Sequence, residues 1–166
     1  MRLLALIGAL GIVVAIAAAV YFFGGFYNVA AQDDPAPVAW ALIKVRMASV
    51  DRHATVNPPA GYDTPEKIQA GAKTFLAAGC TNCHGGPGVD WAKFSEGLHP
   101  GPPDLKEVVP NREPRHLFWV VKNGINMTGM PSFADAIKDE DIWPLVAFLK
   151  KLPSVSDADF KTWTGK

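Results

Sequence analysis

One short stretch, Cys80-Thr81-Asn82-Cys83-His84, constrains the fold of this chain more than any other. The C-x-x-C-H spacing is typical of covalent attachment of a c-type haem, with one thiol for each of two vinyl groups. The histidine that follows lies beneath the porphyrin, where its imidazole ligates the iron. The chain has two cysteines, so both are used at this one site. We therefore predict one covalent haem c, attached through Cys80 and Cys83, with His84 as an iron ligand.

Other uses of the cysteine pair fit the sequence less well. A zinc site needs four nitrogen or sulfur ligands, and the chain has neither a second C-x-x-C nor an H-x-x-x-H. A thioredoxin-like pair belongs in a βαβ context, whereas the surrounding sequence has little strand pattern. A disulfide between Cys80 and Cys83 would close a loop too small to contribute much stability. The haem interpretation is favoured over all three.

An uninterrupted apolar segment occupies the N-terminus. No charged residue lies between Leu3 and Phe23, and a bilayer-spanning helix needs about 20 apolar positions. Arg2 precedes the segment and Asp33-Asp34 follow it, which favours a cytoplasmic N-terminus and an exported remainder. We predict a single-pass anchor in the bacterial inner membrane, in contact with lipid through residues 3–23, and a haem domain in the periplasm.

A cleaved signal peptide is the alternative to a retained anchor. Val29-Ala30-Ala31 has the small residues of a cleavage site. The apolar segment is nevertheless longer than the usual signal-peptide core of about 7–15 residues, which favours the anchor. Export agrees with the motif, because haem attachment to C-x-x-C-H is expected on the outer face of the bacterial inner membrane.

The rest of the chain reads as helices separated by loops. Its length of 166 residues allows one compact domain with additions, and its 16 basic and 16 acidic residues balance, which argues against a nucleic-acid partner. Asp34-Pro35 predicts the start of a helix that runs from Val38 to about Ala54. This helix is so apolar that it must be covered by the haem domain, the membrane surface or another subunit, and the sequence does not separate these.

Three further helices are predicted by cap residues and apolar periodicity. They run from Thr64-Pro65 to Ala78-Gly79, from Glu113-Pro114 to Asn123-Gly124, and from near residue 138 to Leu152. The predicted organisation is a transmembrane anchor (1–27), a periplasmic helix with a Pro-rich linker (28–63), a haem domain (64–153) and a C-terminal tail (154–166).

The sixth position of the iron needs its own assignment. A methionine closes the site and suits an electron carrier, whereas an open position permits ligand binding or catalysis. We predict Met130, because Gly129 lets the backbone approach the ring and Pro131 favours an extended conformation before it. Met127 and, more remotely, Met47 are the alternatives. Only a bis-histidine haem would give an iron-binding role to the remaining histidines, which are His53, His99 and His116.

From about Thr64 to Leu152 the chain resembles a class I cytochrome c. The shared features are a first helix with Gly71 and Phe75, the C-x-x-C-H motif, a Pro-rich loop, the Gly129-Met130-Pro131 loop and a last helix with Phe148. Residues 117–131 are more narrowly similar to the membrane-anchored monohaem cytochromes c of proteobacteria. The resemblance implies an all-α cytochrome c fold, with helices packed around one covalent haem, here preceded by a transmembrane helix.

The resemblance also implies roles for individual residues. Gly71 and Phe75 would pack across the last helix at Phe148. A proline of Pro102-Pro103 would offer its carbonyl to the outer ring nitrogen of His84. Trp119 or Arg112 would reach a haem propionate.

We therefore predict an electron-transfer protein rather than an enzyme. Its iron would cycle between Fe(III) and Fe(II) with His84 and Met130 as ligands, in a respiratory or dehydrogenase-linked chain. Its partners would be membrane-bound or periplasmic redox proteins, such as a quinol-oxidising complex, a terminal oxidase or a dehydrogenase. The alternative is a haem-based sensor or enzyme for a small ligand, with a labile sixth ligand.

Overall fold

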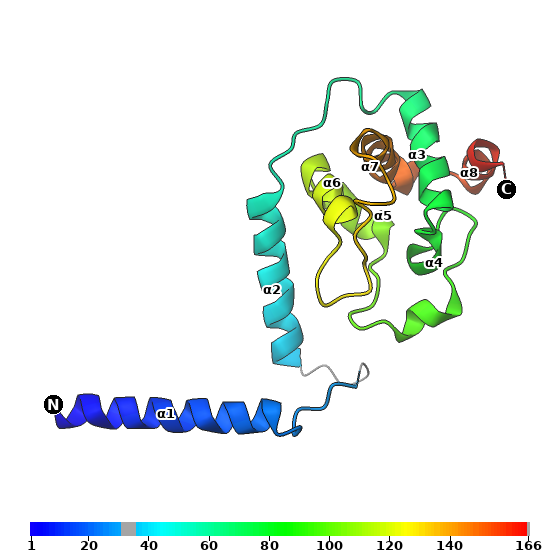
Figure 1. Cartoon of the computed structure of the whole chain (residues 1–166). Coiled ribbons are helices and arrows are strands. Elements are labelled where there is room, and N and C mark those ends of the chain that lie inside the picture. The colour runs from blue at the N-terminus through cyan, green and yellow to red at the C-terminus, as the bar shows by residue number, and fades with distance from the viewer. Residues whose placement is uncertain (31–35, 166) are drawn as a thin grey trace. The chain divides into compact units, whose positions relative to one another are not determined.

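The structure of the protein is a computed structural model that describes residues 1–30 and 36–165. The described residues form helices, 3-10 turns and loops, with one isolated antiparallel bridge between Gly86 and Val89 and no strand (Figure 1). The prediction of an all-α fold is confirmed. The predicted helix start at Asp34-Pro35 and Ala31 of the alternative cleavage site lie outside the described residues.

The elements follow one another in the order shown by the labels of Figure 1. They are α1 (Arg2–Phe23), α2 (Ala36–His53), α3 (Pro65–Ala77), α4 (Thr81–His84), η1 (Lys93–Gly97), α5 (Leu105–Val108), η2 (Val109–Asn111), α6 (Pro114–Asn123), α7 (Asp139–Lys151), η3 (Leu152–Ser154) and α8 (Asp157–Thr164). The chain divides into two compact units, Met1–Asp34 and Pro35–Lys166.

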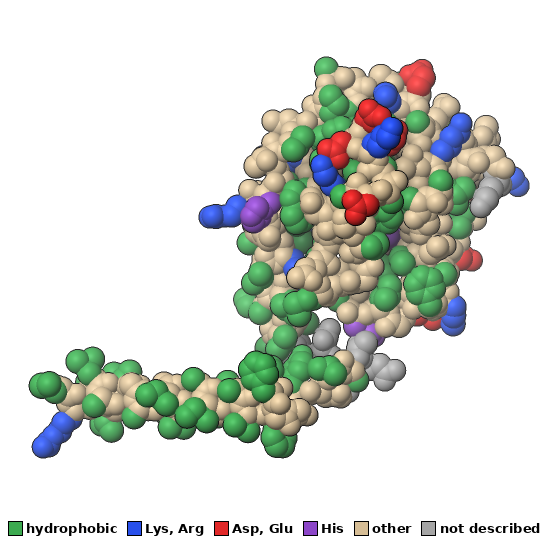
Figure 2. Space-filling model, in the orientation of Figure 1, with side chains coloured by type: hydrophobic (Ala, Val, Ile, Leu, Met, Phe, Trp, Pro, Cys, Tyr) green, Lys and Arg blue, Asp and Glu red, His purple; other side chains and the backbone are tan. Residues whose placement is uncertain are grey.

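Helix α1 is apolar on all of its faces. It has 22 residues, its most apolar 18 residues have a mean hydropathy of 2.8, and none of its residues is buried. Figure 2 shows hydrophobic side chains along the visible face of this helix and a basic side chain only at its N-terminal end. Among the described residues it is the one helix that is long and apolar enough to cross a membrane. Both a retained anchor and a signal sequence have these properties.

The core of the second unit forms where α3 crosses α7. Gly71 of α3 lies directly on the backbone of α7, where a Cβ atom would overlap the carbonyl group of Pro144 and approach Cβ of Phe148. Phe75 follows one turn later, and its ring centroid is 5.2 Å from that of Phe148. The predicted packing of Gly71 and Phe75 on the last helix of the haem domain is therefore confirmed.

Helices α6 and α8 complete this core from two sides. Phe118 of α6 stacks on Trp143 of α7 with ring centroids 4.3 Å apart. Phe160 of α8 is 2% exposed and stacks on Phe148 at 5.7 Å. The residues that we predicted to be a tail thus contain a helix that closes the core. Its short apolar pattern, with Phe160 and Trp163 three positions apart, is a weak signal in the sequence.

Helix α2 packs on α6, so the domain predicted at residues 64–153 covers the C-terminal part of this apolar helix (Figure 1). Val50 and Ala54 are 3% and 2% exposed. The N-terminal part of α2 is different, because Trp40 and Val45 remain 64% and 66% exposed. The sequence left three surroundings open for this helix: the domain at residues 64–153, the membrane surface or another subunit. The structure shows that the domain covers the C-terminal part of the helix.

The α3–α7 crossing generates a stability prediction. We expect Gly71→Ala to lower the free energy of unfolding by about 3 kcal/mol, because the new methyl group meets rigid backbone rather than a flexible side chain. Denaturant unfolding of the haem-loaded protein, followed by helical circular dichroism, measures this change. Gly97→Ala is the control, because nothing lies within 4 Å of the Cβ position there. Equal unfolding midpoints for the two variants would contradict the assignment.

Candidate functional site

The C-x-x-C-H motif forms a single helical turn at the end of α3. Gly79 ends α3 with a φ of 75°, and the amide of Cys80 donates to the carbonyl of Phe75 over 3.1 Å. The amides of Cys83 and His84 both donate to the carbonyl of Cys80, over 3.2 and 3.0 Å. Residues three and four positions apart share a helix face, so the two thiols and the imidazole project to the same side.

The two thiols are free and half-buried, and burial makes the Cys80 thiol poorly suited to redox exchange. Burial raises the pKa of the Cys80 thiol to about 11, with a smaller contribution from the neighbouring Cys83. A thiol with so high a pKa stays protonated at neutral pH, and the thiolate is the form that attacks disulfides and binds zinc. Within residues 1–30 and 36–165, no group of three or more His, Cys, Asp and Glu side chains is arranged to hold a metal ion. The zinc and thioredoxin-like interpretations gain no support.

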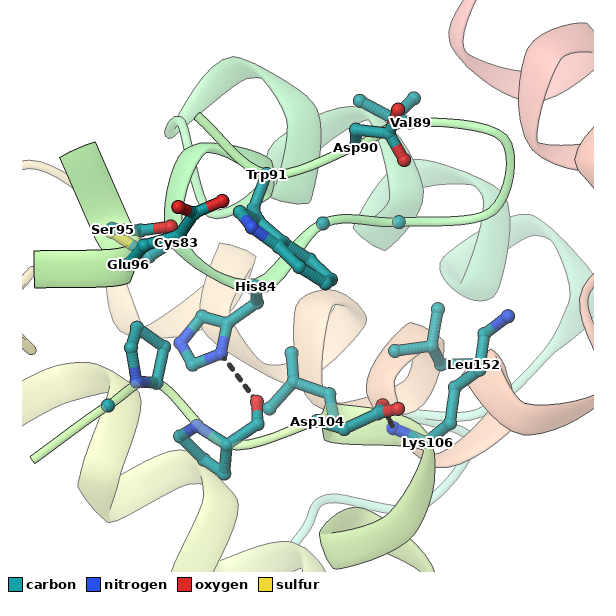
Figure 3. A pocket seen from close by; sticks show the side chains of 16 residues that line it. Cys83, His84, Val89, Asp90, Trp91, Ser95, Glu96, Asp104, Lys106 and Leu152 are labelled. Atoms are coloured by element: carbon teal, nitrogen blue, oxygen red, sulfur yellow. Dashed lines mark hydrogen bonds between the residues drawn. The ribbon is translucent and has the colours of Figure 1, made fainter. Parts of the chain in front are cut away.

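The imidazole of His84 is oriented by the Pro-rich loop. Its Nδ1 lies 3.1 Å from the carbonyl oxygen of Pro103, shown as a dashed line in Figure 3. A carbonyl only accepts, so Nδ1–H donates and Nε2 keeps a free lone pair. Burial lowers the pKa of His84 below its usual value, and the Pro103 carbonyl opposes this effect more weakly. The ring is therefore neutral with Nε2 free, which is the form that a metal-ligating histidine takes.

A cavity of about 470 Å³ opens beside His84. Its volume lies in the range of about 300–1,000 Å³ that is usual for cofactor sites. Figure 3 shows the Trp91 ring beside the His84 imidazole, and both residues line the cavity together with Cys83. Lys106 is the one Lys or Arg side chain of this lining. Of the two cysteines, Cys83 lines the cavity and Cys80 does not. The cavity size, the Cys83 thiol and the neutral imidazole fit a haem c.

Met130 lies in a loop that packs against the Pro-rich loop rather than in the lining of this cavity. The amide of Ile125 donates to the carbonyl of Met130 over 3.2 Å, which closes the loop. A Cβ atom on Gly129 would lie 3.0 Å from Leu98, so the methionine loop touches the segment that leads to Pro103. Met130 is half-buried, whereas the alternative ligand Met127 is 66% exposed. Its ligation of the iron remains a prediction.

Trp119 and Arg112 lie away from the cavity at His84. Trp119 lines a smaller cavity of about 180 Å³ beside Ala54 and Val56, and its ring centroid is 6.3 Å from that of His53. The guanidinium of Arg112 donates to the sulfur of Met47 over 3.1 Å. Neither side chain lines the cavity that holds His84. The assignment of either residue to a propionate remains a prediction.

Two residues around the site were missed by the sequence analysis as candidates for a role. Lys106 lines the cavity, and only its nearness to Pro103 signals this in the sequence. The ammonium of Lys150 donates to the carbonyls of Val109, Pro110 and Arg112 over 3.0–3.1 Å. Because these partners lie about 40 positions away, no local pattern indicates the contact.

Comparison with known proteins identifies the domain that surrounds the motif. The family model described as cytochrome C oxidase, cbb3-type, subunit III matches residues 66–149, half of the chain. The quinohemoprotein alcohol dehydrogenase ADH-IIG of Pseudomonas putida is 30% identical over 112 residues, which are 68% of this chain and 14% of the relative. The quinohemoprotein alcohol dehydrogenase of Comamonas testosteroni is 30% identical in an alignment of 136 residues that covers 77% of this chain and 18% of the relative.

The chain spans less than a fifth of the length of these two curated relatives. No solved structure gives a significant match. The family match covers the helices that carry and surround the C-x-x-C-H turn, from the start of α3 to the end of α7. This protein therefore belongs to the class I cytochromes c, in the family described as cytochrome c oxidase, cbb3-type, subunit III, and it is an electron-transfer haem protein.

Proposed function

We propose that this protein is a membrane-anchored, periplasmic one-electron carrier with one haem c. Cys80 and Cys83 hold the haem covalently, and His84 and Met130 are the two axial ligands. The observation that carries this proposal is the helical turn at residues 80–84, in which the His84 imidazole is neutral and fixed by the Pro103 carbonyl. When bound, the haem supplies one-electron chemistry, because its iron is stable in both the ferric and ferrous states.

The residues around the turn limit how far the site rearranges during electron transfer. The hydrogen bond to Pro103 keeps the His84 ring in one orientation and raises the basicity of Nε2. Gly85 follows with a φ of 62°, and a Cβ atom there would lie 3.1 Å from the carbonyl oxygen of Val89 and 3.5 Å from the Trp91 ring. The chain thus folds back tightly over the motif at Gly85.

Helix α1 supports the proposed attachment to the membrane. Its 22 residues extend for about 33 Å at 1.5 Å each, close to the thickness of a bilayer core. A tethered carrier stays at a high effective concentration near other membrane proteins. The two curated relatives are named as alcohol dehydrogenases, so we propose a dehydrogenase as one electron donor. A quinol-oxidising complex and a terminal oxidase are the other candidate partners.

The proposed iron ligation predicts the reactivity with carbon monoxide. We expect the absorption spectrum of the reduced native protein to stay the same when CO is added, because Met130 occupies the sixth position. Met130→Ala should bind CO, since alanine offers no ligand. Met127→Ala is the matched control, because that side chain is 66% exposed, and it should behave like the native protein. CO binding by the native protein would instead support a sensor or enzyme with a labile sixth ligand.

The proposed attachment predicts how the haem behaves on extraction. Acidic organic solvent should leave the haem on the native polypeptide and on each single variant, Cys80→Ala and Cys83→Ala, because one thioether remains. The double variant should release all of it. Absorption of the protein pellet and of the solvent phase measures the distribution. Release of haem from the native protein would contradict covalent attachment.

The anchor predicts the mass and the location of the mature protein. Intact-mass measurement should find the residues of α1 retained, and the haem should sediment with the membranes until detergent is added. A variant that begins at residue 28, exported by an unrelated signal peptide, should give a soluble haem protein with the same absorption spectrum. A native protein that lacks residues 1–31 would establish the cleaved signal peptide instead.

A further inference from the structure

Arg46 on α2 contacts the loop that holds Met130, which is distant in the sequence. Its Nη2 donates to the carbonyl oxygen of Met127 over 2.8 Å, although the two residues are 81 positions apart. A charged donor gives a hydrogen bond roughly twice as strong as a neutral donor. The contact therefore joins a helix that precedes the matched family domain to the loop with the proposed sixth ligand.

Inside that loop, the hydrogen bonds are short-range. The Thr128 hydroxyl donates to the carbonyl of Ile125 over 2.7 Å and accepts from the amide of Met130 over 3.1 Å. The amide of Met127 donates to the Asn126 side chain over 2.9 Å. These bonds shape the loop but do not fix it to the rest of the protein. Gly129 packs on Leu98 at one end of the loop, and the Arg46 contact adds a second attachment at its midpoint.

The backbone at Met127 needs such external support. Its φ is 59°, and it is the one described residue other than glycine with a positive φ. A non-glycine residue holds this conformation only where its surroundings favour it over the ordinary alternatives. The Met127 side chain is 66% exposed, so core packing does not provide that support. The Asn126 side chain supports this backbone from within the loop by accepting from the Met127 amide, and the bond from Arg46 to the Met127 carbonyl supports it from outside.

Helix α2 gives Arg46 a fixed base. Val50, one turn after Arg46 and on the same face, is 3% exposed against α6. The adjacent Met47 accepts a hydrogen bond from the Arg112 guanidinium over 3.1 Å. A side chain on a helix that is packed against the domain loses less conformational entropy when it forms a hydrogen bond than a side chain on a mobile segment does.

We propose that Arg46 is a positioning residue for the sixth iron ligand: by holding the carbonyl of Met127, it keeps the loop in the conformation that presents Met130. Helix α2 then acts as a strap that sets how easily the iron exchanges this ligand. The inference rests on the proposed ligation by His84 and Met130. Loss of the strap frees the loop, so that the open form of the site becomes more populated.

The test compares variants of the full-length, haem-loaded protein. We expect Arg46→Ala to lower about fivefold the CO concentration that half-saturates the reduced protein, the effect of one charge-assisted hydrogen bond at a partly exposed site. In the native protein this concentration lies well above the one used for the difference spectrum, so that spectrum stays flat. Arg46→Lys retains a charged donor at this position, so its CO binding should lie between that of the native protein and that of Arg46→Ala. Arg52→Ala is the control, because it removes an exposed arginine from the same helix. Amide hydrogen exchange at residues 125–130 should quicken in Arg46→Ala alone.

The outcomes separate this inference from the proposed function. If Met130→Ala binds CO while Arg46→Ala matches Arg52→Ala in both measurements, the strap is overturned and the ligation stands. If Met130→Ala fails to bind CO, the ligation is overturned, and the inference with it. If Arg46→Ala quickens exchange throughout α6 and α7 as well, Arg46 stabilises the whole fold, which also overturns the positioning role.

Discussion

The contact of Gly71 with the backbone at Pro144 is the constraint on which the site depends. A helix pair with a glycine at its crossing point packs backbone against backbone, so α3 has almost no freedom to slide or rotate on α7. Phe75, one turn further along α3, then fits between Phe148 and Phe160. Because α3 is fixed in this way, its C-terminal end is fixed too, and the C-x-x-C-H turn begins directly there. The position of the C-x-x-C-H turn therefore depends on the apolar crossing of α3 and α7 at Gly71, which lies more than one helical turn away.

The environment of the turn then selects one chemical form for each group. Burial disfavours charge, so the Cys80 thiol and the His84 imidazole are both neutral at neutral pH. Neutral groups are costly to hold in an apolar pocket only if their polar atoms lack partners. The Pro103 carbonyl satisfies the single N–H of the imidazole. A haem c offers an iron to the remaining nitrogen and a vinyl group to each sulfur atom. The chemical form of these side chains therefore agrees with the family assignment.

The main helices and the motif were predictable because their signals are local. Thr64 caps α3 by accepting from the amide of Lys67, as its place before Pro65 indicated. The α7 helix begins at Asp139 and ends at Lys151, close to the predicted bounds. Helix α8 escaped prediction because eight residues offer too few apolar positions for a period to be read. Phe160 is recognisable as a core residue only from its contacts with α3 and α7.

The site was less predictable wherever it depends on distant contacts. Trp119 lies beside the end of α2 because α2 packs on α6, and the sequence left the position of α2 open. The apolar side chains of α2 lie on several sides of the helix, so periodicity does not select the face that packs. The same applies to Arg112, whose guanidinium turns toward Met47 rather than toward the cavity at His84.

These distant contacts form a continuous connection from the core to the methionine loop. Lys150 of α7 uses all three ammonium protons on the carbonyls of Val109, Pro110 and Arg112, which fixes the segment before α6. The guanidinium of Arg112 then contacts Met47, next to Arg46 on α2. The acceptors are three backbone carbonyls and one thioether sulfur, and each accepts a hydrogen bond from a cationic side chain. A helix that lies before the matched family domain is in this way coupled to α7, the same helix against which α3 sets the position of His84. The helix α3 that carries the His84 turn and, through Arg112 and α2, the loop that carries Met130 are therefore both connected to α7.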